Sequence, residues 1–242
     1  MNLVIDIGNS STKMALFDAG KMLFSFRAKD LSTKKIQDIL IGQREEIKRA
    51  IISSTKKIPE FVPDLISEYI PEIHILSHET KLPFKIEYST PKTLGSDRIA
   101  GIAGVFREFE GDNALIIDSG SAITIDYLID KKYIGGNISP GINMRLKALH
   151  RYAEKLPLVS LTGKAKSPGR GTEEGIESGV IFGIVYEINE YIRTFLMEHP
   201  KGKVILTGGD AEFLENRLSF PATLIPDLVI TGLDFILEYN AK

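Results

Sequence analysis

The chain has 242 residues, a formal charge of −2 at pH 7 and a hydrophobic content of 43%, which is the composition of an ordinary globular protein. This composition excludes a disordered chain and a collagen, and the absence of cysteine excludes disulfides and thiolate-bound metals. The balance of 30 basic and 32 acidic residues gives no positive field, so we expect no nucleic-acid partner. The apolar runs are far shorter than the roughly 20 residues of a membrane span, and no signal peptide is recognisable. We therefore expect no membrane partner and a cytoplasmic protein.

Two segments that lie far apart in the sequence repeat one pattern. Residues 3–10 read Leu-Val-Ile-Asp-Ile-Gly-Asn-Ser, and the apolar residues 14–17 follow them closely. Residues 115–121 read Leu-Ile-Ile-Asp-Ser-Gly-Ser, and the mostly apolar residues 123–128 follow in the same way. Each copy is typical of a strand, a glycine turn and a second strand. The sequence therefore predicts two copies of one hairpin unit.

The other elements are predicted in chain order from periodicity and turn residues. In the first half we expect strands over 21–27, 50–53 and 73–76, and helices from Ser32 through Ile47 and over 61–69. In the second half we expect strands over 133–138 and 203–206, and helices over 96–106, 143–153, 172–197 and 228–238. Ser96 and Thr172 are expected to cap their helices. The alternation of strands and helices predicts an α/β protein with two similar halves, residues 1–95 and 96–242.

Two connections lack periodicity. Residues 78–95 form a loop of unusual length for a compact domain, and such loops tend to bind ligands. Residues 156–171 carry Lys164, Lys166 and Arg170 among glycine, serine and proline. This second segment is either a mobile basic loop or a solvated linker.

The first turn has the residues of a phosphate site. Asp6 ends a strand, a glycine turn supplies backbone N–H groups and hydroxyls, and Lys13 supplies a positive charge. Asp6 could hold Mg²⁺ or its waters, although in a plain hairpin it would only accept hydrogen bonds from the turn. A second Asp-x-Gly turn at Asp118 favours function, because two such turns facing each other would clamp the phosphates of a nucleotide.

Five motifs together resemble the type III pantothenate kinases in order and spacing. They are Asp6 to Lys13, Gly95-Ser96-Asp97-Arg98, Asp118 to Asp126, Gly135-Gly136-x-Ile138-x-Pro140-Gly141 and Thr207-Gly208-Gly209-x-Ala211. The repeated hairpin also resembles the wider superfamily of acetate and sugar kinases, heat-shock ATPases and actin. This resemblance implies two ribonuclease-H-like α/β halves. It also implies an ATP-dependent kinase that converts pantothenate to 4′-phosphopantothenate, the first step of coenzyme A biosynthesis.

The resemblance also implies roles for single residues. Asp97 would be the general base for the attacking hydroxyl, and Arg98 would bind the carboxylate of pantothenate. The remaining pantothenate site would comprise Tyr88, Gly95, Ser96 and Thr172. ATP and its phosphates would be bound by Asp6, Gly8, Asn9, Ser10, Ser11, Thr12, Lys13, Gly120, Ser121, Thr124, Gly208 and Gly209.

The cofactors and the oligomeric state follow from the same resemblance. Mg²⁺ would be bound near Asp6, directly or through water, and a monovalent cation, K⁺ or NH₄⁺, near Asp118. Thr172 would reach the substrate across a homodimer interface. Three glycines spaced four residues apart, Gly175, Gly179 and Gly183, leave a groove suited to close helix packing, within the subunit or between subunits.

Two other functions stay open. One is another small-molecule kinase of the same superfamily, because a phosphate clamp does not identify the acceptor. The other is a non-catalytic regulator that binds nucleotide or pantothenate. Only an enzyme needs Asp97 as a base.

Overall fold

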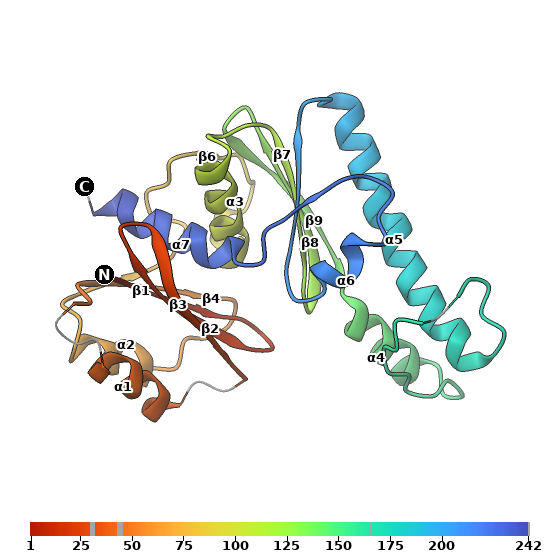
Figure 1. Ribbon diagram of the computed structural model, residues 1–242, viewed down its shortest axis with the longest axis horizontal. Helices are drawn as coiled ribbons and strands as arrows, with labels where there is room; N and C mark the ends of the chain where they lie inside the picture. Colours follow the sequence, from red (N-terminus) through yellow and green to blue (C-terminus); the bar gives the residue numbers. More distant parts are fainter. Residues whose placement is uncertain (30–31, 43–45, 165, 242) are drawn as a thin grey trace. The chain divides into compact units, whose positions relative to one another are not determined.

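The computed structural model describes residues 1–29, 32–42, 46–164 and 166–241 (Figure 1). By their contacts these residues form two compact units. The first unit comprises residues 1–112, 128–135 and 227–242, and the second comprises residues 113–127 and 136–226. The units follow packing rather than chain order, so the expected division into residues 1–95 and 96–242 stays a prediction about the two sequence halves.

The first unit contains a five-stranded sheet in the order β3-β2-β1-β4-β5. Its strands are β1 (Asn2–Ile7), β2 (Thr12–Asp18), β3 (Lys21–Ala28), β4 (Arg49–Ser54) and β5 (Glu72–Ile75). The first three strands form an antiparallel meander, whereas β4 is parallel to both β1 and β5. The short strand β6 (Lys85–Ile86) pairs in parallel with Lys132 and Tyr133, the first residues of β9 (Lys132–Pro140).

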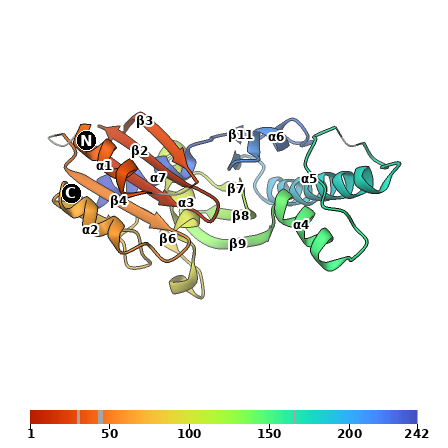
Figure 2. The ribbon, with the colours of Figure 1, turned by 90° about the horizontal axis from the view of Figure 1, so that it is seen from below.

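Helices cover both faces of this sheet (Figure 2), and alternation along its strands sends side chains to both helical layers. Leu3 and Ile5 pack in one core with helices α1 (Thr33–Gly42) and α2 (Phe61–Ser67). Helices α3 (Ser96–Glu108) and α7 (Leu228–Asn240) pack against each other, and α7 also contacts β1, β2 and β4. Val4 and Asp6 alternate with the residues of the first core, so they point toward this second pair of helices.

The second sheet, most of which lies in the second unit, repeats the strand order of the first; its residues 128–135 belong to the first unit. Its strands are β7 (Ala114–Ser119), β8 (Ala122–Ile129), β9 (Lys132–Pro140), β10 (Lys203–Thr207) and β11 (Thr223–Leu224). They are ordered β9-β8-β7-β10-β11, with β10 parallel to β7 and to β11. The unit also contains the helices α4 (Ile142–Tyr152), α5 (Thr172–Glu198) and α6 (Ala211–Glu215). The repeat predicted from the two Asp-x-Gly hairpins is thus present in the topology.

Some local predictions are wrong. The first helix is described over Thr33–Gly42, and Ile47 is not helical; residues 43–45, which fall within the predicted helix, lie outside the described residues. Neither Ser96 nor Thr172 caps its helix: the N-cap positions are Gly95 and Gly171, which have no side chain to donate or accept a hydrogen bond. The strands β6 and β11 and a single 3₁₀ turn at Pro91–Thr93 were not predicted, because segments this short carry no periodicity. No helix among the described residues is both long and apolar enough to cross a membrane.

Candidate active site

Three polar side chains lie in one row across the first sheet. In the strand register, Asp6 stands opposite Lys13 on β2 and opposite Ser53 on β4. Their neighbours along the strands, such as Ile5 and Ile52, point into the core on the opposite face. The row therefore faces α3 and α7, at the carboxyl ends of the parallel strands β1 and β4, which is where α/β sheets bind ligands.

The start of α3 is tied to this row by Ser96. The Ser53 hydroxyl donates to the Ser96 hydroxyl at 2.9 Å, and the Ser96 hydroxyl donates to the Ser54 carbonyl at 2.9 Å. The backbone N–H of Ser54 also donates to Ser96, at 3.1 Å. This is why Ser96 does not cap α3, since its hydroxyl is bound to β4 instead. The next residue, Asp97, is consequently placed near enough to Asp6 for their charges to interact.

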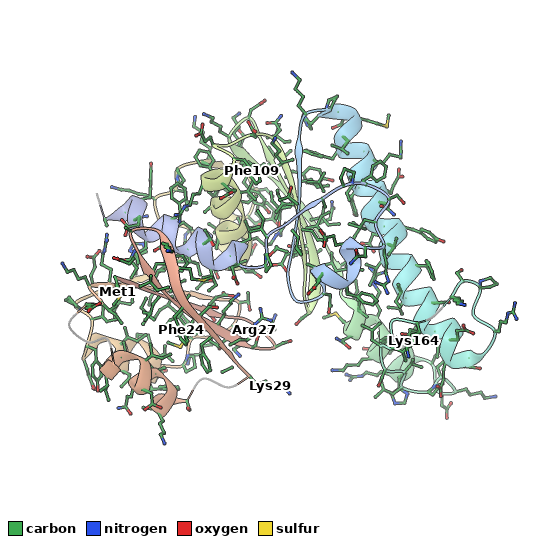
Figure 3. All side chains as sticks on the ribbon, viewed as in Figure 1. Met1, Phe24, Arg27, Lys29, Phe109 and Lys164 are labelled. Atoms are coloured by element: carbon green, nitrogen blue, oxygen red, sulfur yellow. The ribbon has the colours of Figure 1, made fainter. Side chains whose placement is uncertain are left out.

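Asp6 is a carboxylate in an unfavourable environment for charge. Burial raises its pKa to about 6; the Ser53 hydroxyl opposes this rise, and the like charge of Asp97 adds to it. Lys13 and Arg27 lower the pKa again, but by less. Arg27 extends from the end of β3 (Figure 3). Among the described residues, no group donates a hydrogen bond to the buried Oδ1 of Asp6. Such an oxygen suits a cation.

Lys13 is held by an acidic residue that the motifs do not include. Its Nζ pairs with a carboxylate oxygen of Asp227, the residue immediately before α7. Both side chains are partly buried, with exposed fractions of 16% for Lys13 and 31% for Asp227. The ammonium group is thus fixed at the same end of the sheet as Asp6.

Arg98 lies among aromatic rings. Its guanidinium carbon is 5.8 Å from the ring centre of Tyr88 and 5.8 Å from that of Tyr133, and the side chain is buried. The two rings stack on each other with centres 5.9 Å apart. Gly135 has a φ of +125°, and a Cβ there would lie 3.8 Å from the Tyr88 ring. These residues form an aromatic and cationic cluster, and a guanidinium of this kind can bind a carboxylate.

The residues of the first turn differ in accessibility. The N–H of Gly8 donates to the carbonyl of Ser11 at 3.0 Å, which closes the turn. Asn9 and Ser10 are exposed, whereas Thr12 is buried. The exposed part of the turn is the part that can meet a ligand from solvent.

The second turn is built mainly from backbone. Asp118 stands opposite Thr207 in the register, as Asp6 stands opposite Ser53. A Cβ on Gly208 would lie 2.4 Å from Asp118 Oδ1 and 2.4 Å from the Ser119 carbonyl, so only glycine fits there. The N–H of Gly120 donates to the Ala122 carbonyl at 3.0 Å. Among the described residues, the buried hydroxyl of Ser119 has no hydrogen-bond partner.

Other predicted residues of the second unit lie near this turn. The N–H of Asp210, one residue after Gly209, donates to the Ser119 carbonyl at 2.9 Å. Burial raises the pKa of the Asp210 carboxyl. Ser121 is exposed and Thr124 is half-buried. The two glycine motifs that the sequence places 88 residues apart, at Gly120 and Gly208, are therefore brought to one place in this unit.

Thr172 lies apart from the turn, as the exposed first residue of α5. The basic loop before it, in which Lys164 is exposed, is held by Glu177. This buried carboxylate accepts hydrogen bonds from the N–H groups of Thr162 and Gly163, the latter at 2.8 Å. Burial would raise the pKa of Glu177, but these bonds outweigh it and lower the pKa. Ala165, inside this loop, lies outside the described residues.

Three residues of the first unit were missed by sequence reasoning. Asp227 and Tyr133 belong to elements that pair with the site only through the fold, so no local pattern marks them. Ser53 ends a predicted strand that is parallel to β1, and this position could have been found from the rule that ligands bind at the carboxyl ends of strands.

Comparison with known sequences gives one consistent result. The sequence model of the family described as "Type III pantothenate kinase" matches residues 2–194. The type III pantothenate kinase of Phocaeicola vulgatus is 39% identical over 243 residues, spanning the whole of both chains. That of Cytophaga hutchinsonii is 38% identical over 242 residues, with 99% of this chain and all of the relative covered.

Comparison with solved structures supports the fold. A candidate Baf family transcriptional activator from Campylobacter jejuni superposes with a TM-score of 0.61 at 24% identity, covering 99% of this chain and 98% of the other. A candidate N-acetylmannosamine kinase from Listeria monocytogenes gives a TM-score of 0.55 at 10% identity, covering 99% of each chain. The likeness to sugar kinases confirms the two ribonuclease-H-like halves that the repeated hairpin predicts.

Proposed function

The chain belongs to the type III pantothenate kinase family, and we propose that it phosphorylates the primary hydroxyl of pantothenate with ATP, the first step of coenzyme A biosynthesis. The observation that carries the mechanism is the placement of Asp6, Lys13, Ser53 and Asp97 together at the end of the first sheet. Phosphoryl transfer asks mainly for positioning and charge neutralisation, and this group of residues provides both.

The phosphates of ATP are proposed to lie at the first turn. Exposed groups of Asn9 and Ser10 and the ammonium of Lys13 would bind their oxygens. The orphaned Oδ1 of Asp6 fits Mg²⁺, which when bound would neutralise charge on the phosphates. Among the described residues, no group of three acidic or histidine side chains could hold a metal ion. Water and the phosphates would therefore complete the coordination.

Asp97 is proposed to take the proton from the pantothenate hydroxyl. It lies in the first turn of α3, where its Oδ1 accepts a hydrogen bond from the N–H of Arg98 at 2.9 Å. The helix start favours its negative charge, and the Ser53 and Ser96 link fixes its distance from Asp6. Arg98, lying against Tyr88 and Tyr133, would bind the carboxylate at the other end of pantothenate.

The second turn is proposed to bind the nucleotide and a monovalent cation, K⁺ or NH₄⁺. The glycines at Gly120 and Gly208 leave room for close approach, and Ser121 and Thr124 offer hydroxyls. Oxygen atoms of Asp118 and Ser119 converge on Gly208, and hard oxygen ligands suit such a cation. Activity that does not change when sodium replaces potassium would refute the cation site.

The working unit is proposed to be a homodimer. Among the described residues, nothing lies within 4 Å of a Cβ placed on Gly175 or Gly179, and at Gly183 the guanidinium of Arg145 on α4 lies 3.9 Å away, so the part of the groove at Gly175 and Gly179 is not filled. Large apolar side chains are exposed on nearby elements of the same unit: Ile138, Met144, Leu149, Tyr152 and Tyr186. Burial of such exposed apolar side chains would favour a partner chain, which would supply Thr172 to the pantothenate site.

Two experiments test the dimer. Analytical ultracentrifugation measures the oligomeric state, and a monomer at concentrations where the enzyme is fully active would refute a shared site. Mixing Thr172→Ala with Asp97→Asn chains should regenerate one intact site per heterodimer. A site made within one chain cannot give that recovery.

The activity itself is tested by product analysis. Purified protein is incubated with ATP, Mg²⁺ and pantothenate, and 4′-phosphopantothenate is sought by mass spectrometry. Turnover with acetate or a sugar but not with pantothenate would assign another acceptor. A regulator without catalysis would bind ATP and give no product, and its role in cells would survive Asp97→Asn. The expected cytoplasmic location stays a prediction.

A further inference from the structure

Asp227 joins the two ends of the chain within the first unit. Its carboxylate pairs with the ammonium of Lys13, which is 214 positions earlier in the sequence. The family match ends at residue 194, so it assigns no role to Asp227. Lys13 belongs to the proposed phosphate-binding turn, and Asp227 pairs directly with its ammonium.

The fold fixes Asp227 more firmly than a surface acid. Its backbone carbonyl accepts hydrogen bonds from the N–H and the hydroxyl of Thr231, at 2.9 and 3.0 Å. The following residue, Leu228, touches α3 so closely that a Cβ on Gly104 would lie 2.6 Å from the Leu228 carbonyl. One turn further on, a Cβ on Gly232 would lie 1.8 Å from the Ala100 carbonyl. The start of α7 is therefore locked against the helix that carries Asp97.

A lysine ammonium on a flexible stem needs such a partner to act at a defined point. The four-carbon side chain has many rotamers, and holding it in one of them opposes its conformational entropy. The ammonium has three donors, so it can keep its bond to Asp227 and still donate to a phosphate oxygen. The carboxylate also compensates the charge of a lysine that is only 16% exposed.

We propose that Asp227 is a positioning residue, which holds the ammonium of Lys13 where it meets the phosphates of ATP. The proposal rests on the function proposed above, because it assigns Lys13 to those phosphates. It makes the C-terminal helix a part of the site that orients the phosphoryl donor. Asp227 itself is not expected to contact the substrate.

A double-mutant cycle tests whether Asp227 acts through Lys13. kcat/KM for ATP is measured for the wild type, Asp227→Asn, Lys13→Met and the double variant. Coupled residues are non-additive, so we expect Asp227→Asn to lower kcat/KM roughly tenfold alone and to have almost no further effect in the Lys13→Met background. Asp227→Glu, which keeps the charge, should recover most of the loss.

Asp234 provides a matched control on the same helix. It is a buried acid that accepts a hydrogen bond from Asn2 at 2.9 Å and pairs with Arg107 at 3.4 Å, away from the first turn. Asp234→Asn should lower the melting temperature, yet leave kcat/KM within about twofold at a temperature where it is folded. Any small effect it has should multiply with that of Lys13→Met, because distant sites are additive.

The proposal is overturned if Asp227→Asn has wild-type kcat/KM, if its effect multiplies with that of Lys13→Met, or if Lys13→Met is fully active. Should Asp227→Asn not fold, the same cycle built on Asp227→Ala decides the question. The ATP dissociation constants of the four proteins, measured by calorimetry, provide the same coupling without turnover. If the wild type makes no 4′-phosphopantothenate, the proposed function fails, while this binding cycle still decides the role of Asp227.

Discussion

The two Asp-x-Gly turns share one pattern of strands but present different chemistry. At the first turn, β2 places Lys13 opposite Asp6 and the neighbouring strand places Ser53 on the other side. At the second turn, Thr207 takes the place of Ser53, but β8 contains no basic residue at all. Asp118 instead lies beside two glycines, Gly120 and Gly208. The comparison teaches that the same strand order places a paired lysine beside the aspartate in one copy and glycines beside it in the other, and we propose an anion site at the first turn and a cation site at the second.

The largest expected effect is the loss of the base. Asp97→Asn should lower kcat by roughly 10²- to 10⁴-fold, because the amide cannot accept the proton of the attacking hydroxyl. ATP binding should persist, since the turn and Lys13 are untouched. Steady-state kinetics and calorimetry on the same preparation check both parts. Undiminished turnover would contradict the assignment of Asp97 as the general base.

Lys13 and Thr124 sharpen the contrast between the turns. Lys13→Met should lower kcat by roughly 10²- to 10³-fold, the range seen when one preorganised charge-stabilising donor is removed. Thr124 in the second unit is buried to a similar extent. Thr124→Val should lower kcat by about tenfold or less, because a neutral hydroxyl contributes less than a charge. Rates measured at saturating ATP decide this. Equal losses would mean that the two turns share the charge stabilisation.

Acid should inactivate the enzyme through Asp6. Burial and the charge of Asp97 raise the pKa of Asp6 to about 6, so the free enzyme holds a proton there below that pH and binds a cation poorly. We expect kcat/KM for ATP to fall as the pH drops through about 6, and Asp6→Asn to abolish this acid limb along with most activity. The pKa of Asp6 is about 6 in the folded protein and 3.8 in the unfolded chain, so the protonated carboxyl contributes stability at low pH. The free energy of unfolding therefore falls as the pH rises through about 6.

Asp234 is the control for that pH profile. Burial raises its pKa as well, although Asn2 and Arg107 lower it in part. Asp234→Asn should keep the acid limb of kcat/KM unchanged while altering the pH dependence of the melting temperature. An acid limb that disappears in Asp234→Asn would show that the profile reports unfolding rather than cation binding.

The smallest expected effect is at the proposed interface. Thr172→Ala removes one hydroxyl, so the KM for pantothenate should rise by roughly fivefold, the equivalent of about 1 kcal/mol. The KM for ATP should not change, because Thr172 is not part of either turn. Initial rates with each substrate varied in turn give the comparison. A larger change for ATP than for pantothenate would contradict the assignment.

The sequence predicts those parts of the fold that depend on a local pattern of residues. The hairpins around Asp6 and Asp118 combine alternating apolar residues with a glycine turn, and both strands of each hairpin form as predicted. The predicted caps at Ser96 and Thr172 are wrong, because a hydroxyl residue at a helix start has the sequence pattern of a cap even where it does not act as one. For Ser96, the hydroxyl is bound to the neighbouring strand β4, a contact that the local sequence does not reveal.

The site could be predicted only in part, because some of it depends on contacts between distant residues. The sequence motifs identify Asp6, Lys13 and Asp97, each of which lies beside a turn or a helix start. Asp227 and Tyr133 stand in ordinary sequence, and their importance comes from the packing of α7 on α3 and the pairing of β9 with β6. Gly104 on α3 and Gly232 on α7 lie where the two helices approach closely, and they are the sequence feature that could have indicated this contact.

The central claim, that the two turns divide the cations between them, is tested most directly by paired titrations. Initial rates are measured against Mg²⁺ and against K⁺ for the wild type, Asp6→Asn and Asp118→Asn, at a protein concentration and pH where all three are folded. The account predicts that Asp6→Asn raises the Mg²⁺ concentration for half-maximal rate and leaves the K⁺ curve in place, whereas Asp118→Asn raises the K⁺ requirement alone. Variants that both shift the same curve, or that exchange the two effects, would contradict it.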